Sequence, residues 1–247
     1  MAGKLLTLID HSLEASYALR FACVLGQQKK AEVQAMHVIQ YLPAALAVGS
    51  GWARRHWEKE QIEQMEREIE RMVSSEGVCK NVNIVPLVTM GSVSSEVLNQ
   101  LKKESYGMVI SGVHYSKLSQ KPYLGSLHTH LIEKSPYPIA LVTSFKPVEK
   151  ILLFLDDTIC LEKTKDFLKR FFNQSPVLTL SNSQNILDKI EDVVSKELVK
   201  EDKIVERIKS EASKMDVIII VSGNLDLLVH FSKEILPETL GAIVLFR

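Results

Sequence analysis

One short apolar run near the start of the chain recurs in similar form in its second half. Lys4–Ser12 reads KLLTLIDHS and Lys150–Thr158 reads KILLFLDDT, so that Asp10 is matched by Asp156. A nearly unbroken apolar run that ends at an acidic residue is typical of a strand buried on both faces of a parallel sheet. The recurrence therefore predicts an internal duplication, with two units of similar fold following one another along the chain.

The residues after the first run alternate between strand and helix patterns. We expect strands at 4–9, 33–39, 83–90, 108–111 and 138–143, and helices that begin near Ser12, Trp52, Ser92 and Ser126. Alternation of this kind predicts an open, doubly wound parallel sheet with helices on both faces. Pro86 places the third strand at the edge of that sheet, because proline cannot donate to the hydrogen-bond ladder. We expect Gly26 to end the first helix.

The second half repeats this pattern less completely. IIVSG at Ile219–Gly223 resembles MVISG at Met108–Gly112, and Ala242–Phe246 resembles the fifth strand. Residues 185–214 are expected to be mostly helical, and Leu198-Val199 is the only candidate there for a third strand. No Gly-Ser pair follows the IIVSG run, so this half keeps the scaffold and lacks the parts of a phosphate site.

Composition narrows the class of protein. Hydrophobic residues make up 46% of the 247 residues, which is enough for a sizeable core, and Lys+Arg equal Asp+Glu at 30 each. The zero net charge gives no electrostatic argument for binding nucleic acid or an anionic membrane. No apolar run approaches the about eighteen residues of a membrane span. Asp10 interrupts the N-terminal apolar stretch before it could act as a signal peptide, so we expect a cytoplasmic protein.

The cysteine pattern agrees with a reducing compartment. Cys23, Cys79 and Cys160 share no short spacing, which argues against a disulfide framework and against a CxxC metal or redox pair. Cys23 lies in an apolar helix pattern and is expected to be a buried, unpaired thiol.

The stretch Met108–Leu127 has the features of a ligand site. A glycine just past a parallel strand, here Gly112, lets backbone N–H groups come close to a ligand. Gly125 and Ser126 stand at a helix start, where a hydroxyl, free N–H groups and the positive end of the helix dipole can bind phosphate. The plain alternative is an ordinary strand–loop–helix connection with two turn glycines.

Ligands of doubly wound sheets bind outside the carboxyl ends of the strands. Asp10, Val38 and Gly112 each lie at such an end, so we expect them to converge on one crevice.

These features together resemble the universal stress protein family. The resemblance is carried by KLLTLIDHS, by the strand end Met36-His37-Val38, and by the glycine spacing after the fourth strand. Nucleotide-binding members of the family show Gly, two residues, Gly, nine residues, Gly, then Ser or Thr. Here that spacing falls on Gly112, Tyr115, Gly125 and Ser126, with tyrosine in place of the middle glycine.

The resemblance implies an α/β fold of two tandem, doubly wound parallel-sheet domains, Rossmann-like with flavodoxin-like order. The first would cover residues 1–146 and carry the candidate nucleotide site, and the second, degenerate one would cover 147–247. Residues 138–143 would pair with Ala242–Phe246, so that the two domains pack as an intramolecular pseudo-dimer.

The resemblance also implies an adenine-nucleotide site, with ATP as the expected ligand, in the first domain. Asp10 would lie near the ribose or adenine, and the backbone of Val38 would face the adenine. Gly112 and Gly125 would let the loop wrap the phosphates.

Ser126, together with the N–H of Leu127, would bind phosphate oxygens.

Tyr115 leaves two outcomes open. The loss of one hydrogen bond to a charged group would weaken binding about ten- to a hundredfold, whereas stacking of the ring on a base would support binding. Whether Mg²⁺ accompanies the nucleotide also stays open.

Three functions remain as hypotheses. The first is a stress-response or regulatory protein that binds ATP in its first domain and hydrolyses it slowly at most, because no catalytic base is evident. The second is an interaction module with a decayed site, working on an unknown protein partner or as a homodimer through the Gln40–Gly51 loop or the helix after it. The third, ranked last, is an ATP-using enzyme. No catalytic or metal residue is predicted, since His128 and His130 point to different faces of a helix.

Overall fold

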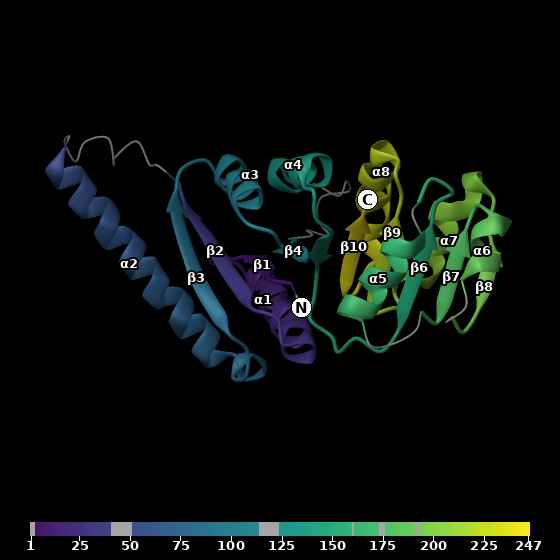
Figure 1. The fold of residues 1–247 in the computed structure, drawn as a ribbon, viewed down its shortest axis with the longest axis horizontal. Coiled ribbons are helices and arrows are strands. Elements are labelled where there is room, and N and C mark those ends of the chain that lie inside the picture. Colours follow the sequence, from purple (N-terminus) through teal and green to yellow (C-terminus); the bar gives the residue numbers. More distant parts are fainter. Residues whose placement is uncertain (1–2, 41–50, 114–123, 160, 173–175, 191–192) are drawn as a thin grey trace.

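The computed structural model describes residues 3–40, 51–113, 124–159, 161–172, 176–190 and 193–247. Tyr115 and all but the ends of the Gln40–Gly51 loop lie outside these residues. One ten-stranded sheet runs the length of the described structure, in the order β3-β2-β1-β4-β5-β10-β9-β6-β7-β8 (Figure 1).

The strands are β1 (Leu5–Leu8), β2 (Val33–Ile39), β3 (Ile84–Met90), β4 (Met108–Gly112), β5 (Ile139–Val142), β6 (Ile151–Leu155), β7 (Leu178–Ser181), β8 (Lys196–Leu198), β9 (Val217–Val221) and β10 (Ala242–Phe246). The α-helices are α1 (Leu13–Lys29), α2 (Trp52–Ser75), α3 (Val93–Lys103), α4 (Ser126–Lys134), α5 (Leu161–Phe171), α6 (Gln184–Lys189), α7 (Ile204–Ala212) and α8 (Leu225–Ile235). Short 3₁₀ turns are η2 (Gly77–Cys79), η3 (Glu201–Lys203) and η4 (Leu236–Glu238).

Each half of the sheet has the same strand order. The first half reads β3-β2-β1-β4-β5, and the second, read inward from its own edge, reads β8-β7-β6-β9-β10. The first strand of each half lies between the second and the fourth, which is the Rossmann-like form of the doubly wound sheet. Within each half every strand pair is parallel.

The two halves join through one antiparallel pair. β10 runs against β5, with Ile243 opposite Leu141 and Ala242 opposite Val142. This confirms the expected pairing of the two last strands inside one chain. The side chains of Leu141 and Ile243 are fully buried, so the seam between the halves is part of the core.

Helices cover both faces of the sheet. One continuous core lies between the sheet and α3, α4, α7 and α8, and a second lies between the opposite face and α1, α5 and α6. A third cluster packs α2 against α1 and the β2–β3 edge. Figure 1 shows α2 as the outermost element at that end of the molecule.

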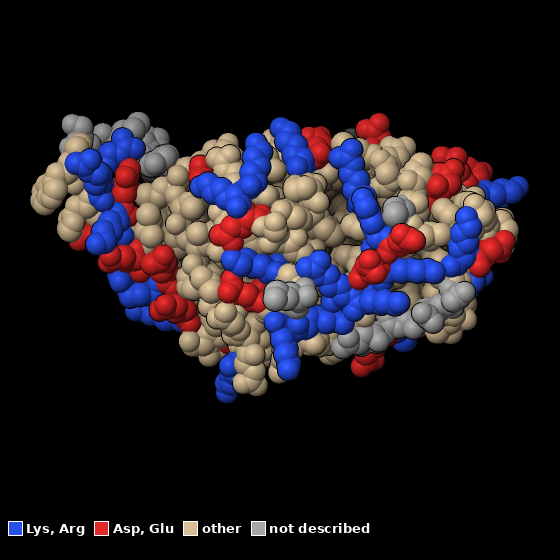
Figure 2. All heavy atoms as spheres, in the orientation of Figure 1, with Lys and Arg blue, Asp and Glu red and all other residues tan. Residues whose placement is uncertain are grey.

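Lysine and arginine side chains gather over α1 and α5 on the face shown in Figure 2, with acidic side chains among them. There the ammonium group of Lys29 donates to the carbonyl oxygen of Lys169 at 3.1 Å. A side chain of α1 thus contacts the backbone of α5 across the seam.

The first helix begins as predicted and ends later than predicted. The Ser12 hydroxyl accepts a hydrogen bond from the Ala15 N–H at 3.1 Å, which caps α1. The helix continues through Gly26 to Lys29, and it is Lys30 that adopts the left-handed conformation, with φ 50°. A Cβ on Gly26 would lie 2.9 Å from Cγ2 of Val33, so this glycine permits close packing of α1 rather than ending it.

Two expectations for the second half need correction. The third strand there is Lys196–Leu198, which starts two residues before the expected pair Leu198-Val199 and includes only Leu198 of it. The strand register also corrects the expected match of Met108 with Ile219. Leu5 pairs with Met108, whereas Ile151, the counterpart of Leu5 in the second half, pairs with Val217. Similarity of the letters MVISG and IIVSG therefore misplaces the strand by two residues.

The prediction of an unpaired Cys23 is wrong. Cys23 in α1 and Cys79 in η2 form a disulfide across 56 residues of sequence. The chain path through β2 and α2 returns η2 to the surface of α1, and no short-range spacing in the sequence signals this approach.

Candidate functional site

A cavity of about 510 Å³ opens at the carboxyl ends of β1, β2 and β4. It is lined by residues from these strand ends and from the adjoining starts of α1 and α4, including Asp10, Val38, Gly112 and Leu127. The expected convergence of Asp10, Val38 and Gly112 is thus confirmed. Their roles in binding stay a prediction.

A second cavity, of about 680 Å³, adjoins the first and shares Asp10 and Leu127 with it. Ser126, at the first turn of α4, lines this second cavity, as do Ser92 and Ser94 at the start of α3. The Ser92 side chain does not cap its own helix. The starts of two helices, each with unused backbone N–H groups, therefore face the same space.

Asp10 has one carboxylate oxygen free of internal partners. The Ser12 N–H donates to Oδ1 at 2.9 Å, and the Ser12 hydroxyl donates to the same atom. Oδ2 accepts no hydrogen bond from the residues that the structure describes, and the side chain is exposed. This oxygen can accept a hydrogen bond from a ligand hydroxyl without breaking an internal bond.

The two glycines of the predicted site differ in what the protein requires of them. A Cβ on Gly112 would lie 2.3 Å from the backbone carbonyl of Glu14, so Gly112 is needed for α1 to pack against β4 whether or not a ligand binds. Gly125 precedes α4 with φ −57°, which any residue adopts. A Cβ there would meet only Nδ1 of His128, at 3.7 Å, among the described residues. Nothing in this part of the chain requires glycine at position 125.

His128 lines the first cavity and was not singled out by the sequence as a ligand residue. Its Nε2 lies 3.0 Å from the Ser111 hydroxyl, while its buried Nδ1 has no hydrogen-bond partner among the described residues. Burial lowers the pKa of His128, and the opposing effects of the Gly112 backbone and of Asp10 are smaller. The ring is therefore neutral near pH 7, and its buried Nδ1 is unsatisfied as far as the described residues show.

Other side chains of the cavity were also missed. Gln61, Gln64 and Met65 reach it from α2, and His11 and His37 reach it from the ends of β1 and β2. The Nδ1–H of His37 donates to the carbonyl oxygen of Ile9 at 2.7 Å. The helical spacing of α2 is predicted correctly, but no local pattern shows that this helix lines the cavity.

The matching position in the second half is closed by its own hydrogen bonds. Asp156 is 4% exposed and accepts hydrogen bonds from the Ser222 hydroxyl at 2.6 Å, the Thr158 hydroxyl at 2.9 Å, the Asn182 amide at 3.0 Å and the Asp157 N–H at 2.9 Å. Burial raises the pKa of Asp156, but these donors outweigh it and leave the pKa below its ordinary value. Unlike Asp10, this carboxylate serves the fold.

Asn182 distinguishes the second half from the first at this point of the sheet. The register places Asn182 at the position that Val38 occupies in the first half, since Leu8 pairs with Met36 and its counterpart Phe154 pairs with Leu180. Where Val38 leaves Asp10 free, Asn182 donates to Asp156.

Within the described part of the chain, no three His, Cys, Asp or Glu side chains lie close enough together to hold a metal ion. None of the described helices has the length and apolar character needed to cross a membrane.

Comparison with known proteins completes the description. The model of the Universal stress protein family matches residues 1–143. No curated protein sequence matches the chain significantly.

Among solved structures, a universal stress protein from Archaeoglobus fulgidus DSM 4304 is similar over 100% of this chain and 99% of its own, with 15% identity and a TM-score of 0.66. A functionally unknown protein from Pseudomonas aeruginosa PAO1 is similar over 99% of this chain and 92% of its own, with 11% identity and a TM-score of 0.62. At such low identity these structures support the fold alone.

Proposed function

The chain belongs to the universal stress protein family, and from this premise we propose that it is a stress-response or regulatory protein that binds ATP or another adenine nucleotide through its first half. The observation that carries the proposal is the meeting of Asp10, Val38 and the start of α4 at two adjoining cavities. The cavity volumes lie in the range of about 300–1,000 Å³ that is usual for small-molecule sites.

Each part of the site has a chemical character that suits a different part of an adenine nucleotide. The β2 end at Val38, which lies beside the apolar side chains of Leu8 and Met36, suits the adenine. The free Oδ2 of Asp10 suits a ribose hydroxyl, because a carboxylate accepts a hydrogen bond from a hydroxyl and repels a phosphate.

The phosphates would lie at the start of α4. There no described side chain caps the helix. The Ser126 hydroxyl and the first N–H groups, including that of Leu127, can therefore bind a phosphate, and the helix dipole favours an anion. The room beside Gly125 supports the same assignment, since the described protein leaves this space open and a close phosphate would fill it.

A further observation supports the fit. In the second half the corresponding aspartate is fully used, which confines the proposed site to the first half. A cytoplasmic location, a protein partner of the nucleotide-bound form and a homodimer remain part of the proposal.

Titration calorimetry of the full chain with ATP tests the proposal, together with mass spectrometry of nucleotide released from protein purified without added ligand. Binding that is weakened at least tenfold in Ser126→Ala and lost in Gly125→Val is the expected result. Ser183→Ala is the matched control. Ser183 stands at the start of α6 in the second half, and its side chain does not cap that helix. No bound nucleotide and no heat at millimolar ATP would refute the assignment.

A further inference from the structure

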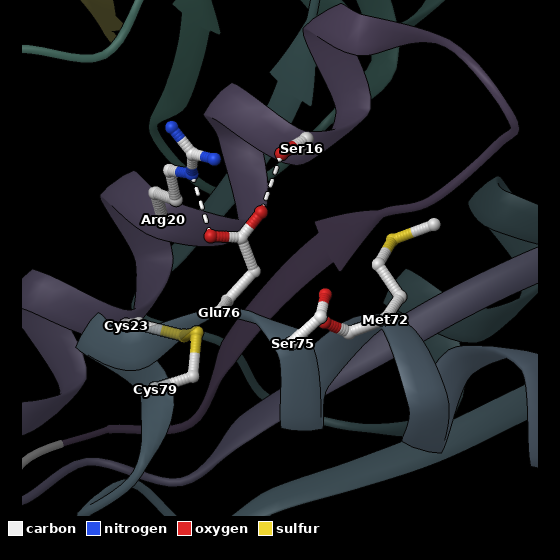
Figure 3. Close-up of a disulfide and its surroundings, with 7 residues drawn as sticks. All are labelled: Ser16, Arg20, Cys23, Met72, Ser75, Glu76 and Cys79. Atoms are coloured by element: carbon white, nitrogen blue, oxygen red, sulfur yellow. Dashed lines mark hydrogen bonds and ion pairs between the residues drawn. A yellow bond between two sulfur atoms is a disulfide. The ribbon is translucent and has the colours of Figure 1, made fainter.

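The Cys23–Cys79 disulfide joins α1, whose start lines the candidate nucleotide cavity, to η2, the turn that follows the cavity-lining helix α2. Cys23 lies in α1, whose first turn lines the cavity, and Cys79 ends η2, directly after α2. Figure 3 shows the bond lying between the two backbones. Both cysteines are buried, with exposed fractions of 0% and 2%.

A polar contact holds the same junction from the outside. Glu76, at the end of α2, accepts hydrogen bonds from the Ser16 hydroxyl at 2.8 Å and from Nε of Arg20 at 2.7 Å (Figure 3). Ser16, Arg20 and Cys23 follow one another at helical spacing on one face of α1. Burial raises the pKa of Glu76, but the bonds from Arg20 and Ser16 together lower it below its ordinary value. We call Ser16, Arg20 and Glu76 together the Glu76 latch.

The contacts between α1 and the end of α2 contribute strongly to holding α2 in place. Only Ile69 of its 24 residues is fully buried. Met65 and Met72 pack, half-buried, against the apolar cluster that contains Cys23 and Cys79. Met65 also lines the cavity, with Gln61 and Gln64 beside it. The apolar cluster therefore connects the disulfide, through Met65, to this wall of the cavity.

We propose that Cys23 and Cys79 form a thiol–disulfide switch that sets the affinity of the cavity for its nucleotide, an inference that rests on the proposed function. In the oxidised chain the wall formed by α2 is anchored covalently. Reduction leaves the Glu76 latch and the thin apolar stripe to hold α2, so the wall loosens and the preorganised cavity loses affinity. Disulfides of proteins in reducing compartments are usually transient or redox-sensing, which agrees with this use.

The chemistry is exchange with a small thiol such as glutathione. Its thiolate attacks one sulfur of the pair, the S–S bond breaks, and the other sulfur leaves as a thiolate that takes up a proton. A second glutathione attacks the mixed disulfide and releases the first cysteine. The protein disulfide is thereby reduced to two thiols while two glutathione molecules are oxidised to one glutathione disulfide.

Because both sulfurs are buried, exchange requires the η2 segment to open, and the Glu76 latch should control how often it does. Glu76→Gln is expected to speed reduction by glutathione roughly three- to tenfold, as alkylation and mass spectrometry would measure. Glu63→Gln is the matched control, since Glu63 pairs with Lys59 at 3.6 Å on the exposed face of the same helix. Equal rates in the two variants would overturn the role of the latch.

The switch itself is tested by ATP titration calorimetry on the full chain at oxidising and reducing glutathione ratios. A Cys160→Ala background limits thiol chemistry to the pair. Affinity is expected to fall about three- to tenfold on reduction. A further Cys23→Ala, Cys79→Ala variant should show the weaker affinity at both ratios. Equal affinities in chains whose disulfide state has been verified would overturn the switch and leave the proposed nucleotide site intact.

Absence of ATP binding in both states would instead refute the proposed function. Hydrogen exchange of residues 52–75 then decides whether the pair controls α2. Faster exchange after reduction, matched in the double alanine variant, would support redox control of this helix. Unchanged exchange, or free thiols at every glutathione ratio, would overturn it.

Discussion

The two matched aspartates should respond in opposite ways to the same substitution. Asp156→Ala removes the acceptor of four hydrogen bonds in a site that is 4% exposed, and it leaves the Ser222 hydroxyl, which is fully buried, without its shortest bond. A hydrogen bond to a charged group contributes about 1.5–3 kcal/mol, and a buried donor left without a partner costs about 1–3 kcal/mol, so the substitution should cost about 3 kcal/mol. For a chain of this length that corresponds to a fall in melting temperature on the order of 10 °C.

Asp10→Ala is the matched perturbation in the first half. Asp10 is exposed, and among the described residues it accepts hydrogen bonds only from Ser12. Its loss should change the free energy of unfolding by about 0.5 kcal/mol or less and should weaken ATP binding. Asp156→Ala should leave ATP binding unchanged in chains that remain folded.

The lowered pKa of Asp156 also predicts how the cost of Asp156→Ala changes with pH. The pKa of Asp156 in the folded state is lowered. Its contribution is therefore fully present above the unfolded-state pKa of about 3.9 and is lost as the pH falls through the folded-state value. The difference in stability between the native chain and Asp156→Ala should thus be largest near neutral pH and narrow as the pH falls below about 4.

Urea unfolding followed by circular dichroism, at neutral and acidic pH, measures these differences. A cost below about 1 kcal/mol for Asp156→Ala at pH 7, or equal costs for the two variants, would refute the reasoning that one aspartate serves the fold and the other the ligand.

Three further predictions concern the frame of the site. Reduction of Cys23–Cys79, which closes a loop of 56 residues, should lower the free energy of unfolding by about 4 kcal/mol; equal melting curves with and without reductant would contradict this. Gly112→Ala should cost about 1–3 kcal/mol because its Cβ would meet the backbone of α1, whereas Gly77→Ala, with open space around it, should cost little in the same urea assay. A fragment of residues 1–146 would expose the edge of β5, all four of whose residues are buried in the full chain, and should associate through it; a monomeric fragment by light scattering would contradict this.

Local patterns of the sequence determined most of the fold. The alternation of apolar runs and amphipathic segments places β1 to β5 and their helices, because strand and helix periodicity is a property of neighbouring residues. The hydroxyl of Ser12 caps α1 as expected, and Pro86 lies in an edge strand. The pairing of β5 with β10 is implied by the resemblance to the universal stress protein family and not by the repeat itself.

Tertiary structure decided which further side chains complete the site and which of the two aspartates is free. Cys79 meets Cys23, and Met65 of α2 meets the cavity, only after the chain has passed through β2 and turned back on α1. Asp10 and Asp156 follow matching runs, yet one is free and the other is enclosed, because the strand beside each ends in a different residue. That residue is more than twenty positions away along the chain, and only the pairing of parallel strands brings it to the carboxylate.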